Sequence, residues 1–233
     1  MHNPEVVIDP SVRALYPDIV VGIVIAHGLD NETACPECDA LLASEIEQTA
    51  ARLGGVEDIP GLPEIAPWRT AYAAFGVKPS KFRSSIEAML RSCASGRLGG
   101  VNPLVDLYNT VSLRHRLPVG GEDLAAIEGP LRLTRAEGGE PFFTIGSGED
   151  QPSAPGEVVW RDDAGIVCRC FNWRESDRTK LTPATTNAVL VIESVAPNGA
   201  ATVRAACDDL AALISNHLGA TTRIVGLPDD DVT

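Results

Sequence analysis

The stretch Thr186-Asn187-Ala188-Val189-Leu190-Val191-Ile192-Glu193 decides the fold class of this chain. It is a run of aliphatic and β-branched residues with polar residues at both ends, which is typical of a buried strand. We therefore expect a strand over residues 187–195. Because side chains alternate along a strand, Val189, Val191 and Glu193 share one face.

This strand belongs to a second half in which apolar residues repeat with a period of two. From residue 130 onward, Gly and Asp turns separate short alternating runs, as in antiparallel sheets. An amphipathic helix is expected at residues 200–218. The further strands expected in this half cover residues 131–136, 141–145, 157–161, 165–171 and 222–225.

The first half has a helical period instead. One buried strand, at residues 18–28, precedes four expected helices. These helices cover residues 36–53, residues 67–75, a third segment that starts at Ser80, and residues 103–115. Helices in one block and strands in another predict an α+β fold, with a helical first half packed on a mainly antiparallel sheet.

Length and composition indicate a globular protein. The 233 residues, 44% of them apolar and 22% charged, can bury a substantial core, and we expect one compact unit. The longest apolar run, residues 19–26, is too short to span a bilayer, and the N-terminus lacks the features of a signal peptide. We expect a cytoplasmic protein without a membrane partner.

The cysteines are expected to be reduced thiols, because the cytoplasm keeps thiols reduced. Cys35 and Cys38 form a Cys-x-x-Cys pair before a helix, a spacing that suits a metal or a redox site. The other close pair, Cys168 and Cys170, lies on one face of an expected strand. A zinc site needs about four ligands, so we expect neither a metal nor another cofactor.

Charge is unevenly distributed along the chain. The net charge of −13 argues against a nucleic-acid partner, because phosphate contacts supply most of such affinity, and we expect no binding to DNA. Residues 69–116, however, contain eight basic and two acidic residues, a local balance of +6. This concentration fits either solvated helix faces or a surface for a polyanion.

Four sequence segments resemble one known family. They are Gly76-Val77-Lys78-Pro79-Ser80-Lys81-Phe82-Arg83-Ser84-Ser85, Val101-Asn102-Pro103-Leu104-Val105-Asp106-Leu107-Tyr108-Asn109, Leu117-Pro118-Val119-Gly120-Gly121-Glu122-Asp123-Leu124, and Arg178-Thr179-Lys180-Leu181-Thr182 running into the stretch quoted first. In this order they resemble the third and fourth (B3/B4) domains of the beta subunit of bacterial phenylalanyl-tRNA synthetase, in their free-standing form.

The resemblance implies a division of the chain into one B3/B4-like domain with additions. Residues 65–195 match the family, and residues 1–64 are expected to complete its core. Residues 196–228 add the last helix and strand, and residues 229–233 form an acidic tail that we expect to be loose.

The resemblance also implies an activity. In the synthetase this domain hydrolyses tyrosine misattached to tRNA for phenylalanine, so we expect an aminoacyl-tRNA deacylase that binds the aminoacylated acceptor end of tRNA. Asn109 matches the asparagine that lines the editing pocket, and Glu193 matches the strand glutamate that recognises the amino acid. Thr186 and Asn187 are candidates to donate hydrogen bonds to the developing oxyanion. From the residues alone, Glu193 could also face solvent and Asn109 could be a helix-surface residue.

The expected pocket departs from the family in one segment. A glycine-rich stretch in the synthetase is replaced here by Cys168-Arg169-Cys170-Phe171-Asn172-Trp173-Arg174. Phe171 and Trp173 either pack in the core or stack on an aromatic ligand or a base. We therefore expect a reshaped pocket.

Basic residues within the matching segments are the candidates for tRNA contacts. They are Lys78, Lys81, Arg83, Arg178 and Lys180. Two other functions fit the same sequence, namely a non-catalytic tRNA-binding module and a binder of a free amino acid or a related small molecule. The negative net charge suits the last of these.

Overall fold

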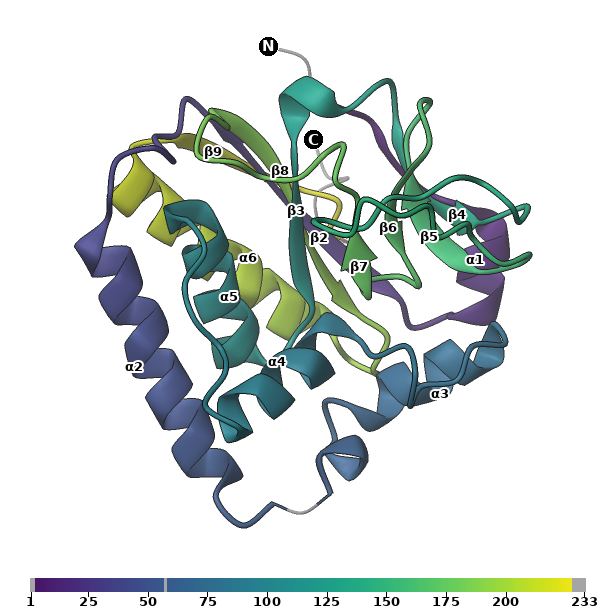
Figure 1. Ribbon diagram of the computed structural model, residues 1–233, viewed down its shortest axis with the longest axis horizontal. Helices are drawn as coiled ribbons and strands as arrows, with labels where there is room; N and C mark the ends of the chain where they lie inside the picture. Colours follow the sequence, from purple (N-terminus) through teal and green to yellow (C-terminus); the bar gives the residue numbers. More distant parts are fainter. Residues whose placement is uncertain (1–2, 57, 228–233) are drawn as a thin grey trace.

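The computed structural model describes residues 3–56 and 58–227 and has an α+β fold built on two sheets (Figure 1). The expected acidic tail at residues 229–233 lies outside the described residues. In the described part of the chain, no helix combines the length and the apolar character that a membrane span requires.

A four-stranded sheet forms the centre of the fold. Its strands, in spatial order, are β3 (Val119–Asp123), β8 (Asn187–Ser194), β2 (Val20–His27) and β9 (Thr221–Val225), and all neighbours are antiparallel. The apolar run quoted first, expected to be a buried strand, is β8, an inner strand that is paired on both edges. Its period of two directs alternate side chains to two different cores.

A five-stranded sheet packs beside it. The spatial order is β1 (Val6–Ile8), β4 (Leu131–Arg135), β5 (Val158–Arg161), β6 (Ile166–Arg169) and β7 (Arg174–Glu175). Only the β1–β4 pair is parallel among the described strands, so the sheets are mainly antiparallel, as expected.

Long helices cover one face of the four-stranded sheet. The helices α5 (Pro103–His115) and α6 (Ala200–Leu218) pack with Val24 and Leu190 of the sheet, and α2 (Pro36–Leu53) packs against α5 (Figure 1). This core buries Leu107 and Leu210 completely.

The opposite face of the same sheet contributes to the largest core cluster. Val189 and Val191 pack there with Leu131 and Trp160 of the five-stranded sheet. Val12, which precedes the family-matching region, belongs to this cluster too. The cluster also receives residues from three shorter helices, α1 (Pro10–Leu15), α3 (Ala66–Ala74) and α4 (Ser85–Ala94). Two short 3-10 helices lie at Ile59–Gly61 and Leu124–Ala126.

Two of the expected element positions are wrong. Residues 141–145 form no strand but only isolated bridges at Phe143 and Thr144, because the side chain of Asp150 accepts the Phe142 N–H that a strand would need for pairing. The helix expected from Ser80 begins at Ser85. A tight turn precedes it, in which Lys78 O accepts hydrogen bonds from Lys81 N and Phe82 N. The hydroxyl of Ser84 accepts a hydrogen bond from Glu87 N, which makes Ser84 the N-cap.

The expectation of reduced thiols is wrong for one pair. Cys35 and Cys38 are joined by a disulfide at the start of α2. The remaining cysteines, Cys93, Cys168, Cys170 and Cys207, are buried thiols.

Candidate functional site

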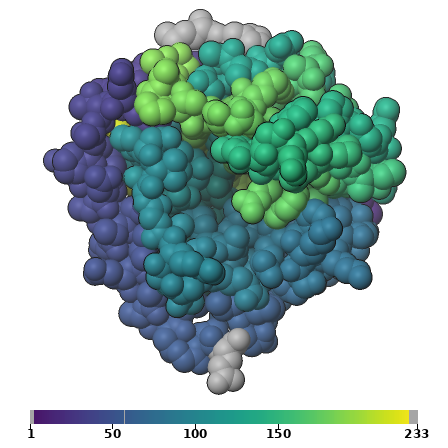
Figure 2. Space-filling view, in the orientation of Figure 1, coloured from purple at the N-terminus to yellow at the C-terminus, as the bar shows by residue number. Residues whose placement is uncertain are grey.

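A cleft opens where α4 and α5 approach β3 and the segment 172–181. It has a volume of about 470 Å³, within the range of roughly 300–1,000 Å³ that small-molecule sites span. Figure 2 shows the surface hollowed where the teal helices meet the green residues of the second half. Apolar side chains, among them Met89, Val101 and Ile145, line much of its wall.

The cleft continues inward into a narrow recess between the two sheets. The two share the backbone of Gly120 and Gly121 and the side chains of Asn172 and Glu175. The recess itself has about 20 Å³ of free space, which is room for roughly one water molecule. A single polar group of a ligand would therefore fill it.

Glu193 points into this recess and is only 2% exposed. Its Oε1 accepts a hydrogen bond of 2.8 Å from Trp160 Nε1, and its Oε2 accepts one of 2.7 Å from Asn172 Nδ2. Burial raises the pKa of Glu193 to about 6, although both hydrogen bonds oppose the shift. Glu193 therefore does not face solvent.

Asn172 reaches Glu193 through an unusual turn. Cys170 and Phe171 adopt left-handed backbone conformations, with φ of 47° and 63°, which is uncommon for residues other than glycine. Such conformations cost roughly 1–3 kcal/mol each and concentrate at functional sites. Asn172 Oδ1 also accepts a hydrogen bond from the hydroxyl of Tyr72, so the amide that holds Glu193 is itself fixed.

Two further carboxyl groups line the recess. Burial raises the pKa of Glu175 to about 7, and the nearby Glu193 adds to this shift while the Gly121 N–H opposes it. Glu122 is 3% exposed, and its pKa is raised by burial and by Glu175. Glu122 Oε2 is buried without a hydrogen-bond partner among the described residues. The three carboxyl groups make the recess suitable for a hydrogen-bond donor or a cationic group.

Polar groups without partners also line the outer cleft. Ser85 Oγ is buried and has no hydrogen-bond partner among the described residues. Asn109 and Tyr108 project from α5 into the same cleft. Within the described ranges, the amide of Asn109 makes no hydrogen bond that would hold it, so it is available to a ligand.

Comparison with known proteins places this arrangement in a family. The family described as "B3/4 domain" matches residues 67–219, which is more than half of the chain. The chain belongs to the B3/4 domain family. No curated protein sequence matches it significantly.

One similar solved structure is an N-terminal fragment of the phenylalanyl-tRNA synthetase beta-subunit from Pyrococcus horikoshii. It aligns with a TM-score of 0.51 and 14% sequence identity over 95% of this chain. The chain spans 51% of that fragment. At this identity the likeness concerns the fold, which agrees with the expected B3/4 architecture.

Phe171 and Trp173 belong to the segment in which this chain differs from the family, residues 168–174, and their surroundings differ. Phe171 is fully buried and packs edge-on against Tyr16 and Trp68, with ring centroids 5.2 and 5.4 Å apart. Trp173 lies in the wall of the cleft, with its ring 4.6 Å from that of Phe82. Of the two expected roles, Phe171 takes core packing, and Trp173 remains accessible to a ligand.

Thr186 and Asn187 do not line the cleft. They lie at the opposite end of β8 from Glu193, and a separation of six residues along a strand corresponds to about 20 Å. Asn187 Oδ1 accepts hydrogen bonds from His27 Nδ1 and Gly28 N instead. The quoted motif runs through the sheet, so its two polar ends emerge on different sides of the domain.

The expected basic residues fall into two groups. Lys78, Lys81 and Arg83 are exposed in the turn that leads directly to Ser85 at the cleft. Arg178, by contrast, donates hydrogen bonds to Ala126 O and to the buried Asp162, which commits its guanidinium to the scaffold. Lys180 lines the cleft and pairs with Asp177 at 2.7 Å.

The candidate site also contains residues that the sequence did not indicate. Glu122 lies in a matching segment, yet nothing in its spacing separates it from an ordinary strand residue. Glu175, Asn172 and Ser85 come from turns and element ends, where no periodic pattern exists. Their common signal is tertiary, because they meet only when the two sheets pack.

Proposed function

We propose that this protein hydrolyses the ester between a misattached amino acid and the terminal ribose of tRNA. Membership of the B3/4 domain family supports this proposal, as does the similarity of its fold to a fragment of a phenylalanyl-tRNA synthetase subunit. The observation that carries it is the cleft, which ends in a recess where Glu193 is held by Trp160 and Asn172.

The reaction requires little covalent help from side chains. An aminoacyl ester is already activated, so a positioned water can attack its carbonyl carbon when the oxyanion is stabilised. The bond between the carbonyl carbon and the ribose oxygen breaks, and the ribose oxygen takes a proton. The products are the free amino acid and tRNA with a free terminal hydroxyl.

Different cleft residues would bind the amino acid and orient the ester. The carboxyl groups at the recess, Glu193 foremost, would accept hydrogen bonds from a donor group of the amino acid. Asn109 and Ser85 have unpaired polar groups in the outer cleft and would orient the ester or the attacking water. The recess admits one polar group, which would restrict the amino acids accepted.

The tRNA would approach over the start of α4. Lys78, Lys81 and Arg83 are exposed there and lead to the cleft at Ser85. Arg69 and Arg91 form ion pairs with the buried Glu87, and Arg83 Nε lies 3.7 Å from the same carboxylate. One negative charge is therefore shared among three positive ones. The local surplus of positive charge would attract phosphate groups.

The test is release of labelled amino acid from a panel of charged tRNAs, including tyrosine on tRNA for phenylalanine. The native chain should release at least one amino acid faster than the uncatalysed rate. Asn109→Ala, Ser85→Ala and Glu193→Ala should each lower kcat/KM by about tenfold to a hundredfold.

Controls separate a lost site from a lost fold. Glu149→Ala removes an exposed carboxylate that does not line the cleft and should retain the native rate. Thermal unfolding of every variant identifies any that no longer folds. Absence of release from every charged tRNA, in an assay where a known editing enzyme is active, would overturn the proposal.

A binder of a free amino acid is the second candidate, and the net charge of −13 favours it, because a small amino acid needs no contacts to phosphate groups. Competition separates the two functions. A free amino acid that binds tightly without tRNA would favour the second candidate, whereas the deacylase requires tight binding only with the tRNA attached.

A further inference from the structure

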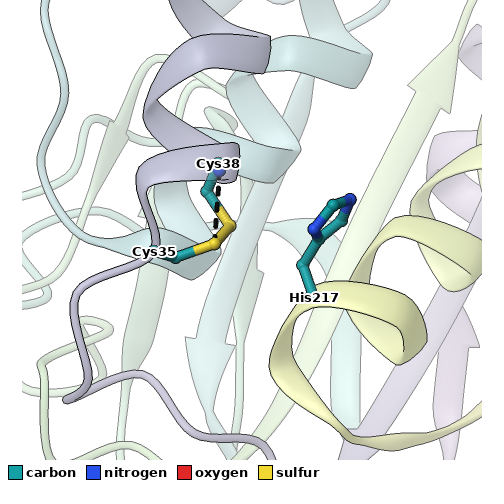
Figure 3. A group of neighbouring side chains, drawn as sticks. All are labelled: Cys35, Cys38 and His217. Atoms are coloured by element: carbon teal, nitrogen blue, oxygen red, sulfur yellow. Dashed lines mark hydrogen bonds between the residues drawn. A yellow bond between two sulfur atoms is a disulfide. The ribbon is translucent and has the colours of Figure 1, made fainter.

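A cluster of metal-ligating side chains lies away from the cleft, at the start of α2. Cys35, Cys38 and His217 each offer one ligand atom, and these atoms all lie within 4.8 Å of one another. Figure 3 shows His217 reaching from the last turn of α6 toward the two sulfur atoms. The sequence indicated the two cysteines but not the histidine, which comes from the far end of the chain.

The two helices are held together at this point by the backbone. Asp30 N donates a hydrogen bond of 3.0 Å to Leu218 O, which ties the segment before α2 to the end of α6. Asn31 anchors the same segment, because its Nδ2 donates to Thr182 O and its Oδ1 accepts from Leu104 N, both at 2.8 Å. The ligand atoms are therefore brought together by a fixed framework.

The geometry suits a thiophilic metal once the sulfurs are separated. Zinc binds Cys sulfur at about 2.3 Å and His nitrogen at about 2.0–2.1 Å, so two tetrahedral ligand atoms lie roughly 3.5–4 Å apart. The disulfide holds the two sulfur atoms too close together for this and leaves them without the negative charge that a ligand needs. Reduction would allow them to move apart within the present framework.

The surroundings of each ligand are consistent with binding. Cys35 is the N-cap of α2, and its Sγ accepts a hydrogen bond of 3.2 Å from Cys38 N, a contact that also stabilises a thiolate. Cys38 is fully buried, whereas Cys35 and His217 are solvent-accessible, which leaves a path for an ion. In the described part of the chain the imidazole of His217 makes no hydrogen bond.

We propose that Cys35, Cys38 and His217 form a zinc site in the reduced protein and that the disulfide is its closed form. A small dithiol transfers two electrons and two protons to the disulfide and is itself oxidised to a cyclic disulfide. The two protein thiols then lose two protons as Zn²⁺ forms two bonds to sulfur and one to the imidazole nitrogen. A water molecule completes the coordination, as at other three-ligand zinc sites.

The test uses the full chain, reduced with a dithiol that is then removed without oxygen. Zn²⁺ is titrated against a chromophoric chelator, and Co²⁺ serves as a second probe because a thiolate ligand gives it a charge-transfer absorption. The reduced chain should bind one ion, and the oxidised chain should bind none at this site. Bound Zn²⁺ should also slow alkylation of Cys35.

Variants assign the ligands. Cys35→Ser should abolish the charge-transfer absorption, and His217→Ala should weaken zinc binding by about tenfold or more, while His217→Cys should restore it. Cys93→Ser removes a buried thiol elsewhere and should bind as the native chain does. The proposal is overturned if the reduced chain binds zinc no better than Cys35→Ser, even if it exchanges disulfides with small thiols, or if His217→Ala binds as tightly as the native chain.

Discussion

The carboxyl group of Glu175 is neutral over a wider pH range in the folded protein than in the unfolded chain. Burial raises its pKa to about 7, from an ordinary value of 4.5. Between these values the folded state holds the proton and the unfolded state has lost it, so stability falls as the pH rises. The contribution is fully present below about pH 4.5 and is lost by about pH 7, with a total of up to about 3 kcal/mol.

Glu175→Gln should remove this dependence. The amide keeps an oxygen for the Gly121 N–H and carries no charge, so the variant should be more stable than the native chain at pH 8 and similar to it near pH 4. Urea unfolding at a series of pH values measures both curves. Some slope should remain between about pH 4.5 and 6 because Glu193 titrates there. Parallel curves, with Glu149→Gln as the reference variant, would contradict the assignment.

At the scale of single residues, the sequence located Glu193 and Asn109 but not their neighbours. The resemblance to the B3/B4 domains indicated Glu193, and the cost of burying a charged residue without partners supported that choice. The partners themselves, Trp160 and Asn172, come from β5 and from a turn, and no local pattern relates them to β8. Thr186 was misplaced for the same reason, since nearness in sequence along a strand became distance in space.

At the scale of elements, strand β3 shows how two adjacent glycines serve different purposes. A Cβ on Gly120 would overlap Glu175 Oε1, the mobile end of a side chain in the recess. A Cβ on Gly121 would overlap Leu190 Cδ1, which belongs to a packed core. One glycine thus leaves room for the site, and the other leaves room for packing.

Gly120→Ala should therefore impair the site more than the fold. We expect its free energy of unfolding to change by less than about 1 kcal/mol, whereas Gly121→Ala should lose about 1–3 kcal/mol through overpacking. Deacylation by Gly120→Ala should fall because the Glu175 carboxyl group is displaced. Gly99→Ala, where a Cβ would meet nothing within 4 Å, is the control for both measurements. The interpretation fails if Gly120→Ala loses more stability than Gly121→Ala.

The long elements were predictable from the sequence, and the short ones were not. Helices α2, α5 and α6 begin and end where the apolar period and the flanking residues indicated, since each repeats its pattern over several turns. Strands β1 and β7 have three and two residues, too few for any period. They exist because neighbouring strands offer free backbone groups, which is a property of the assembled sheet.

At the scale of the whole molecule, the net charge of −13 bears on the proposed polyanionic partner, tRNA. The long-range field repels tRNA, so binding has to depend on local contacts that release counterions from phosphates. Lys78 and Lys81 are both exposed beside the cleft, where such contacts would lie. Arg13 and Arg223 are also exposed, but they lie on α1 and β9.

These two pairs allow a matched comparison, because replacing either pair by alanine lowers the net charge by two. If Lys78 and Lys81 contact phosphates, the double variant Lys78→Ala/Lys81→Ala should bind tRNA more weakly than native. Its plot of log affinity against log salt concentration should be shallower by about 0.7–0.9 for each lost contact. Arg13→Ala/Arg223→Ala should keep the native slope and change only the overall affinity. Equal slopes for both variants would mean that the charge acts through the general field, and that tRNA does not approach over the start of α4.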